Sequence, residues 1–341
     1  MCRYNLNVTP YGQVILAIGV LILASSFVFG YMSVAAAAQE RSLMWPERNI
    51  TLIVPFKPGG GYDICGRIAA SFIEKYLPKK VNIVVRNIDG AAGKIGLMEL
   101  VKAKPDGYTI GVMEAVQIGR TNVLGEAGNI DVTKLTWLGR LDGGGGMMCI
   151  GKGSRFKTIA EMKGQEVRIS GTSQTNFGAL LVARVLEIKP RLINYDSSVD
   201  ACFAVMRGDA DAIIQFSASM MKQVKASEGK LIPLFVGDEK RDPHYPDVQT
   251  AKELGVKGLN GDLLGAAHLL CAPAGMDNNF ADKFEGIVRE ALSDPGYKEK
   301  LEASGYPFYP LYGRDNLGSY VSSVAKGMME DKDLFLSLQK K

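Results

Sequence analysis

Residues 50–63 read ITLIVPFKPGGGYD, and the architecture of the chain can be traced outward from them. The β-branched run 50–54 predicts a buried strand that stops at Pro55. After three glycines, apolar residues recur at every fourth position within 64–77, which predicts a helix with one buried face. A strand, a glycine turn and a helix in this order are typical of the first unit of a parallel α/β sheet.

The same alternation continues along the chain. Residues 81–85 and 108–113 have strand-like composition, and residues 96–103 have helical composition that ends at the turn signal 104–107. Strand, helix, strand, helix and strand within about 70 residues predict a parallel sheet with right-handed crossover connections.

A second set of elements follows the four glycines at 143–146, which we expect to act as a hinge. The predicted strands are 147–150, 166–170, 192–195 and 211–216, and the predicted helices are 177–186, 199–206 and 280–292. The chain has 341 residues, enough for two domains. We therefore expect an α/β protein of two lobes, one formed by residues 45–146 plus 269–341 and the other by residues 147–268.

The first 38 residues have the pattern of an export signal. Arg3 is followed by an uncharged apolar stretch over 14–30 and by small residues that end at Ala38. This order predicts a secretory signal peptide that is cleaved after Ala38. The alternative is an uncleaved anchor, because the apolar segment is also long enough to span a bilayer. Both alternatives place the remainder of the chain outside the cytoplasm.

Charge and cysteine content narrow the possible classes. The net charge is +4, and the basic residues are spread along the chain, whereas a nucleic-acid-binding protein concentrates them on a stripe or arm. We therefore expect no nucleic-acid partner. Beyond the signal segment the cysteines are Cys65, Cys149, Cys202 and Cys271. An oxidising compartment permits disulfides between them, but their apolar surroundings favour buried free thiols.

The glycine turn is the first candidate ligand site. Its glycines let a ligand approach the backbone, and the first N–H groups of the following helix can donate to an anion. We expect Asp63 to cap this helix, to hold a bridging water or to accept a hydrogen bond from a protonated group of the ligand. A plain tight turn is the alternative, and a nucleotide loop is disfavoured because neither phosphate-loop motif is present. The candidate binding residues are Phe56, Gly60, Gly61, Tyr62 and Asp63.

The loop 170–176 is the second candidate, and it also lies between a predicted strand and a predicted helix. Its uncharged hydroxyl and amide side chains suit the reversible binding of a carboxylate. A Ser/Thr-rich capping loop is the alternative interpretation. The candidate binding residues are Gly171, Thr172, Ser173, Gln174 and Asn176.

Catalytic and metal-binding patterns are sparse. The two histidines, His244 and His268, have no partner at metal-ligand spacing, and the motifs G-x-S-x-G and H-E-x-x-H are absent. We therefore expect structural histidines, no metal, no cofactor and no catalytic residue. A hydrolase that uses Asp63 or a hydroxyl of 170–176 would lack a general base.

Several motifs resemble one known family in order and over nearly the whole mature chain. They are Trp45-Pro46-Glu47-Arg48, Ile53-Val54-Pro55-Phe56, Pro58-Gly59-Gly60-Gly61-Tyr62-Asp63, Gly90-Ala91-Ala92-Gly93, Pro105-Asp106-Gly107-Tyr108-Thr109, Gly208-Asp209-Ala210-Asp211-Ala212 and Tyr245-Pro246-Asp247-Val248-Gln249-Thr250. They closely resemble the Bug/TctC family, the periplasmic substrate-binding proteins of tripartite tricarboxylate transporters.

The resemblance implies a type II periplasmic-binding-protein-like fold, with two α/β lobes that close on a ligand in a central cleft. It implies that the loops 56–63 and 170–176 hold a carboxylate between the lobes and that Tyr195 faces the pocket. It further implies a small carboxylate ligand, a transporter permease as partner and a periplasmic location, and we expect a monomer. A sensing receptor of the same fold that serves a signalling system is the alternative.

Two departures from the family pattern bear on ligand choice. Tyr62 stands where a small threonine is usual, and Asn176 with Phe177 replaces a more polar stretch. We expect both departures to narrow the pocket or to make it more aromatic. The resemblance does not carry over which carboxylate is bound.

Overall fold

The computed structural model describes residues 45–128, 130–172, 175–237, 241, 245–256, 264 and 267–337. Contacts divide the chain into two units, residues 1–47 and residues 48–341, and the fold described below is that of the second unit. The predicted signal segment 1–38 lies outside the described residues. Within the described part of the chain, no helix has the length and apolar character needed to cross a membrane.

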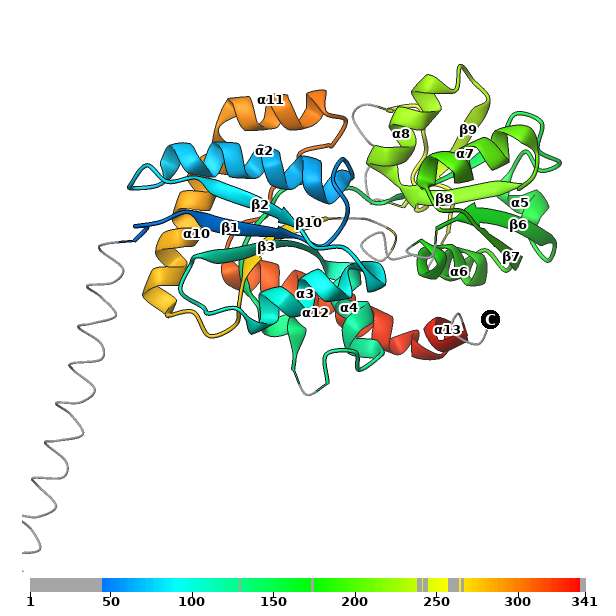
Figure 1. Cartoon of the computed structure of the whole chain (residues 1–341). Helices are drawn as coiled ribbons and strands as arrows, with labels where there is room; N and C mark the ends of the chain where they lie inside the picture. Colours follow the sequence, from blue (N-terminus) through cyan, green and yellow to red (C-terminus); the bar gives the residue numbers. More distant parts are fainter. Residues whose placement is uncertain are drawn as a thin grey trace, which may run out of the picture. The chain divides into compact units, whose positions relative to one another are not determined.

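Two five-stranded sheets organise this unit (Figure 1). The first has the strand order β2-β1-β3-β10-β4, with strands β1 Ile50–Val54, β2 Ile83–Asn87, β3 Thr109–Glu114, β4 Thr136–Arg140 and β10 His268–Ala272. The second has the order β7-β6-β8-β5-β9, with strands β5 Gly146–Gly151, β6 Glu166–Gly171, β7 Lys189–Asn194, β8 Ala212–Phe216 and β9 Leu231–Val236.

Helices cover the sheets. Those associated with the first sheet are α2 Gly61–Tyr76, α3 Lys94–Lys102, α4 Ala115–Val123, α10 Asn278–Ser293, α11 Pro295–Ala303 and α12 Arg314–Glu330, with the short 3₁₀ helices η1 Ala91–Gly93 and η2 Val132–Lys134. Those associated with the second sheet are α5 Ile159–Met162, α6 Asn176–Val185, α7 Ser198–Arg207 and α8 Ser217–Ala226. The described part of the chain ends in α13 Lys332–Ser337.

Both sheets are mixed, whereas the sequence predicts a parallel sheet. The prediction is correct for β1, which pairs in parallel with both β2 and β3. However, β10 runs antiparallel to β3 and β4, and β5 runs antiparallel to β8 and β9. In each sheet one strand, β10 in the first and β5 in the second, therefore runs against its neighbours, and local composition does not reveal this direction.

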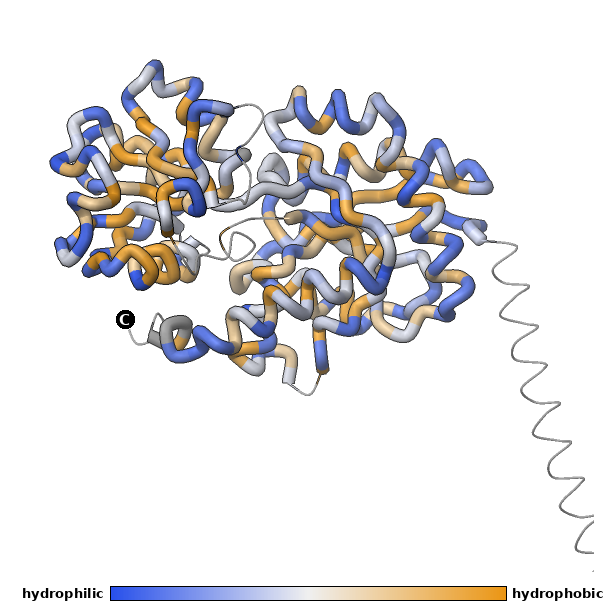
Figure 2. Tube along the Cα trace, turned by 180° about the vertical axis from the view of Figure 1, so that it is seen from behind, coloured by the Kyte–Doolittle hydropathy of each residue, from blue (hydrophilic) through white to orange (hydrophobic). Residues whose placement is uncertain are grey.

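Alternate residues of the second sheet pack against opposite helix layers. Cys149 and Ile213 share a hydrophobic cluster with residues of α7 and α8, whereas Met148 and Ile214 belong to the cluster that includes residues of α6. This is the two-residue period of a strand buried on both faces. In the first sheet, α2 and α11 lie on one side and α3, α4 and α12 on the other (Figure 1). Figure 2 shows the strands of both sheets largely in hydrophobic colours.

The strand directions bring distant loops to one edge of each sheet. Because β4 is antiparallel to β10, and β10 to β3, the carboxyl ends of β1 to β4 lie at the edge where β10 begins. By the same logic, the carboxyl ends of β6 to β9 lie at the edge where β5 begins. The four mature-chain cysteines are buried and free, as the sequence predicts.

Gly96 tests how closely α3 packs on the first sheet. A Cβ atom at Gly96 would lie 2.7 Å from Pro55 Cα and 2.8 Å from Ile88 O, which are backbone atoms that cannot turn away. We expect Gly96→Ala to lower the free energy of unfolding by about 1–3 kcal/mol in urea titrations. The control is Gly286→Ala within α10, where a Cβ atom meets no atom within 4 Å. We expect this control to be stabilising by about 0.5–1 kcal/mol, and equal effects of the two changes would contradict the close packing of α3.

Candidate functional site

The turn between β1 and α2 presents an uncapped helix N-terminus. Gly59 has a φ of +88°, a conformation that favours glycine. Gly60 is the N-cap residue of α2 and makes no side-chain capping bond, because it has no side chain. The first N–H groups of this helix therefore have no intrahelical partner and are available to an anion. The helix dipole favours an anion there by about 0.3–1 kcal/mol per charge.

Asp63 does not cap α2, contrary to the sequence prediction. It is the third residue of the helix, and its carboxylate accepts hydrogen bonds from Gly59 N at 3.0 Å, Arg67 Nε at 2.9 Å and Asn87 Nδ2 at 3.0 Å. Burial alone would raise the pKa of Asp63, but these three donors hold it below its ordinary value. Asp63 is 4% exposed, and its contacts define a role in holding the turn against β2.

Gly61 lies close to a group of buried polar side chains. A Cβ atom at this position would be 3.1 Å from His268 Cε1 and 3.2 Å from Tyr306 Oη, so a larger residue would displace them. The next residue, Tyr62, packs its ring 4.4 Å from that of Phe56 and 4.5 Å from that of His268. The turn therefore rests on an aromatic layer at the carboxyl edge of the first sheet.

Tyr62 also joins α2 to the end of β3. Its hydroxyl donates a 2.6 Å hydrogen bond to Glu114 Oε2, and Glu114 is the register partner of His268 on β10. Burial raises the pKa of Tyr62, and the nearby Glu114 raises it further, so the hydroxyl stays protonated and remains a donor. That Tyr62 narrows the ligand pocket stays a prediction.

Asp142 is the centre of a second buried network. Its carboxylate accepts from His268 N at 2.8 Å, lies 2.7 Å from His268 Nδ1 and accepts from Cys65 Sγ at 3.3 Å. His268 is 5% exposed, which agrees with the prediction of a structural histidine. His244 lies outside the described residues.

The ligand atoms of Cys65, Asp142 and His268 lie within 4.8 Å of one another, which is close enough to hold a metal ion. However, the imidazole and the thiol both approach the same oxygen of Asp142, as in a hydrogen-bond network. Burial also raises the pKa of Cys65 well above its ordinary value, and so opposes the thiolate that a metal requires. The arrangement therefore favours a structural network over a metal centre.

The second predicted loop follows β6. A Cβ atom at Gly171 would lie 2.6 Å from Thr175 Oγ1, which explains the glycine. The Thr175 hydroxyl accepts from Thr172 N at 3.0 Å and donates to Thr172 O at 3.1 Å, so it closes the loop. Asn176 begins α6 and is 9% exposed. Ser173 and Gln174 lie outside the described residues.

Tyr195 lies beside this loop, and Phe177 packs in the hydrophobic core. The N–H of Tyr195 donates to Gly171 O at 2.9 Å, so the end of β7 lies next to the end of β6. Phe177 is 3% exposed and belongs to the hydrophobic core. The prediction that Phe177 makes the pocket more aromatic stays a prediction.

Sequence reasoning missed the partners of the first loop. Glu114, Asp142 and His268 are each separated from Tyr62 by more than fifty residues of chain, and only the sheet topology brings them to one edge. The register of β10 against β3 was not predictable from composition. A usable signal was the placement of acidic residues immediately after apolar strands, at 114 and 142.

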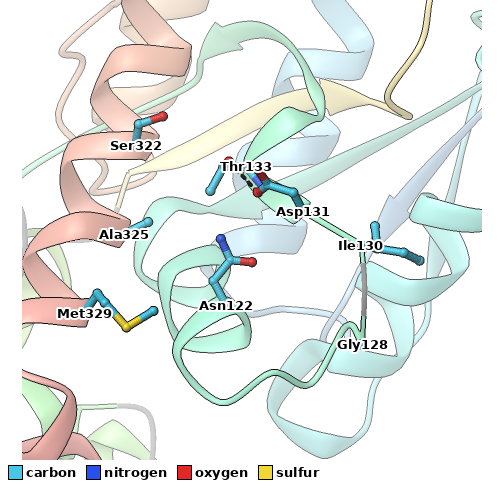
Figure 3. Close-up of a pocket in the computed structure, with 8 residues that line it drawn as sticks. All are labelled: Asn122, Gly128, Ile130, Asp131, Thr133, Ser322, Ala325 and Met329. Atoms are coloured by element: carbon cyan, nitrogen blue, oxygen red, sulfur yellow. Dashed lines mark hydrogen bonds between the residues drawn. The ribbon is translucent and has the colours of Figure 1, made fainter.

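A surface hollow lies elsewhere, between the end of α4, the segment before η2 and one side of α12 (Figure 3). Its lining residues include Asn122, Asp131, Thr133 and Met329. Asp131 caps η2 by accepting from Thr133 N at 3.0 Å and Thr133 Oγ1 at 2.6 Å, so its carboxylate is already engaged. Because the Asp131 carboxylate is engaged in capping η2, this hollow is the weaker candidate.

Comparisons with known proteins agree with this architecture. Residues 66–316 match the model of the tripartite tricarboxylate transporter family receptor, TctC. The UPF0065 protein in the gbd 5′ region of Cupriavidus necator is 26% identical over 326 residues, which cover 93% of this chain and 95% of the relative.

Solved structures share the fold. A TctC solute-binding protein from Polaromonas, without ligand, is 22% identical with a TM-score of 0.69, covering 87% of this chain and 99% of that protein. MatC from Rhodopseudomonas palustris, solved with bound malate, is 23% identical with a TM-score of 0.68, covering 84% of this chain and all of that protein (100%).

The Asp63 network predicts a pH-dependent contribution to stability. The folded pKa of Asp63 is lowered, so the contribution is complete above the pKa of an unfolded aspartate, about 3.9, and is lost as the pH falls through the folded value. We expect Asp63→Asn to lower the free energy of unfolding at pH 7 by about 1–3 kcal/mol, with a difference that narrows below about pH 4. Denaturant titrations of the unmodified protein and of Asp63→Asn at pH 7 and at pH 3 measure this difference in the free energy of unfolding.

The matched control is Asp209→Asn, which removes a carboxylate that pairs with Arg207 and is 52% exposed in its side chain. We expect a change of at most about 1 kcal/mol for this control. An Asp63 effect of the same size at pH 7 and at pH 3 would contradict the assignment.

Proposed function

We propose that this chain, a member of the tripartite tricarboxylate transporter family of receptors, captures a small carboxylate in the periplasm and delivers it to the membrane permease of such a transporter. The receptors of this family are solute-binding proteins and not enzymes. One observation carries the proposal. The N-terminus of α2 is uncapped and lies at the carboxyl edge of parallel strands, where open α/β sheets bind their ligands. Its backbone donors suit a carboxylate that must be released again.

The second sheet supplies the other half of the proposed site. The loop after β6 carries hydroxyl and amide groups at a corresponding edge, and it also leads into a helix, α6, without a side-chain cap. We propose that Thr172, Ser173, Gln174 and Asn176, with Tyr195 beside them, complete the binding of the carboxylate. MatC, which shares the fold, binds malate, and this supports a small organic acid as the ligand.

The organisation of the chain follows from this proposal. We propose that residues 1–38 direct export, and that residues 45–146 plus 269–341 form the first lobe and residues 147–268 the second. The glycine run 143–146 connects β4 to β5, and therefore leads from the first sheet to the second. We propose that it serves as a hinge of a protein that acts as a monomer.

A change at Gly60 tests the carboxylate site. Gly60 has extended φ and ψ values of −83° and 175°, which suit an aspartate N-cap. In Gly60→Asp the new carboxylate would occupy the free N–H groups and repel a ligand carboxylate. We expect affinity for small carboxylates to fall by at least about 10-fold, about 1.4 kcal/mol, in isothermal titration, while the melting temperature is kept or raised.

The matched control is Gly60→Ala, whose Cβ atom would meet only Lys57 O, at 3.9 Å. This variant leaves the N–H groups free, so we expect it to bind within a few-fold of the unmodified protein. Carboxylate binding that survives in Gly60→Asp would place the ligand elsewhere.

A further inference from the structure

Buried polar atoms without a hydrogen-bond partner lie where β3 meets α4. Oε1 of Glu114 and both polar side-chain atoms of Gln117 have no partner. The two residues are only 8% and 7% exposed, so bulk solvent has little access to them. Native proteins pair nearly all such atoms, because an unpaired buried polar group destabilises the fold. These atoms therefore indicate a partner that the protein acquires from outside.

The two side chains share one face of α4. Glu114 is the N-cap residue and Gln117 the third helical residue, and a spacing of three places them side by side. The chain keeps space for the amide, because a Cβ atom at Gly93 would lie 2.4 Å from Gln117 Nε2 and 2.8 Å from Phe56 Cζ. Gly93, Gln117 and Phe56 are thus in contact at the same edge of the first sheet.

This pair of side chains adjoins the proposed carboxylate site. Tyr62 contributes a backbone N–H to the first turn of α2, and its hydroxyl contacts Glu114 at 2.6 Å. A single tyrosine side chain therefore separates the free N–H groups from the unpaired oxygen of Glu114. The two groups are therefore placed as two ends of one site for a small bifunctional acid.

The titratable groups around Glu114 lie on α2, on β10 and in the segment after β4. Tyr62 and Cys65 on α2 are neutral, since burial raises the pKa of both groups. Burial alone would lower the pKa of His268, but Asp142 raises it above its ordinary value, which favours an imidazolium paired with a carboxylate. That pair is neutral overall, so Glu114 determines the net charge of the group.

We propose that Glu114 and Gln117 form a second subsite that binds an ammonium group, and that the ligand is a small amino acid whose carboxylate lies on the N-terminus of α2. This inference rests on the proposed function and specifies the ligand class of the same site. An ammonium group donates three hydrogen bonds, and Glu114 Oε1 and Gln117 Oε1 are two unpaired acceptors for it. A second carboxylate would instead meet the carboxylate of Glu114.

The titration of Glu114 gives the subsite a pH signature. Burial raises the pKa of Glu114 to about 7, against the lowering effects of the Tyr62 hydrogen bond and of His268. An ammonium group favours the ionised form, so its binding releases a proton below pH 7. Affinity for an amino acid therefore rises with pH up to about 7 and then levels off, whereas affinity for a dicarboxylate falls over the same range.

The test uses two matched series of small acids and isothermal titration of the full mature chain. One series has an ammonium group at its second end, beginning with β-alanine, and the other has a carboxylate at the same spacing, beginning with succinate. At pH 8 we expect the best amino acid to bind at least tenfold more tightly than the dicarboxylate of equal length. Between pH 6 and pH 8 its affinity should rise several-fold.

Two variants separate recognition from folding. Glu114→Gln keeps the size of the side chain and an acceptor for Tyr62, and we expect it to lose at least tenfold in amino-acid affinity, to abolish the pH dependence and to leave dicarboxylate affinity unchanged or higher. Gln117→Leu removes unpaired buried atoms, so we expect it to raise the melting temperature of the free protein while it weakens amino-acid binding.

The outcomes are distinguishable. Tighter binding of dicarboxylates, equal losses for both series in Glu114→Gln, or affinities that do not change with pH would overturn the ammonium subsite. If dicarboxylates bind and Gly60→Asp abolishes that binding, the proposed function stands without this inference. If neither series binds at any pH, both proposals fail.

Discussion

The carboxylate of Asp142 is the interaction on which the site depends, because it joins elements that are far apart in the chain. One oxygen accepts the backbone N–H of His268 at the start of β10, and the other contacts the ring of His268 and the thiol of Cys65 on α2. These hydrogen bonds hold β10 and α2 against the segment that follows β4. Gly61 and Tyr62 rest on the same histidine, so the free N–H groups of α2 are positioned by a network beneath them.

Such a network contributes more to geometry than to net stability. Removing two charges from water offsets much of the attraction between them, and a buried ion pair is therefore often no more stabilising than apolar residues of the same volume. Hydrogen bonds to a carboxylate, however, are directional, and Asp142 accepts three from two elements. The cluster thus specifies one position of α2 relative to β10, as a site with backbone donors requires.

Local sequence was sufficient to predict most helices and strands, but it was insufficient to predict which of them lie next to one another. The run 50–54, the glycine turn and the apolar stripe after it predict β1 and α2 because their signals lie within one helical turn or strand. β9 was missed because Pro233 argues against a central strand, and the chain places it at the edge of the sheet. The sequence predicts Asp63 as a cap because one of its donors, Asn87, comes from β2, which local sequence does not place beside it. The position of Glu114 at the end of an apolar run was visible in the sequence, but its neighbour His268 was not, because the register of β10 brings the two together.

The two sheets place unpaired polar groups at equivalent strand ends. β3 is the central strand of the first sheet and β8 that of the second, and each is followed at once by a helix. Glu114 and Gln117 carry such atoms at the end of β3. At the end of β8, Gln215 Nε2 and Ser217 Oγ are likewise buried and without a partner in the structure. Each unpaired atom destabilises the free protein, and a ligand that pairs with it recovers that free energy on binding. A receptor built this way is less stable when empty, and the ammonium subsite proposed at Glu114 and Gln117 would recover part of that free energy when its ligand binds.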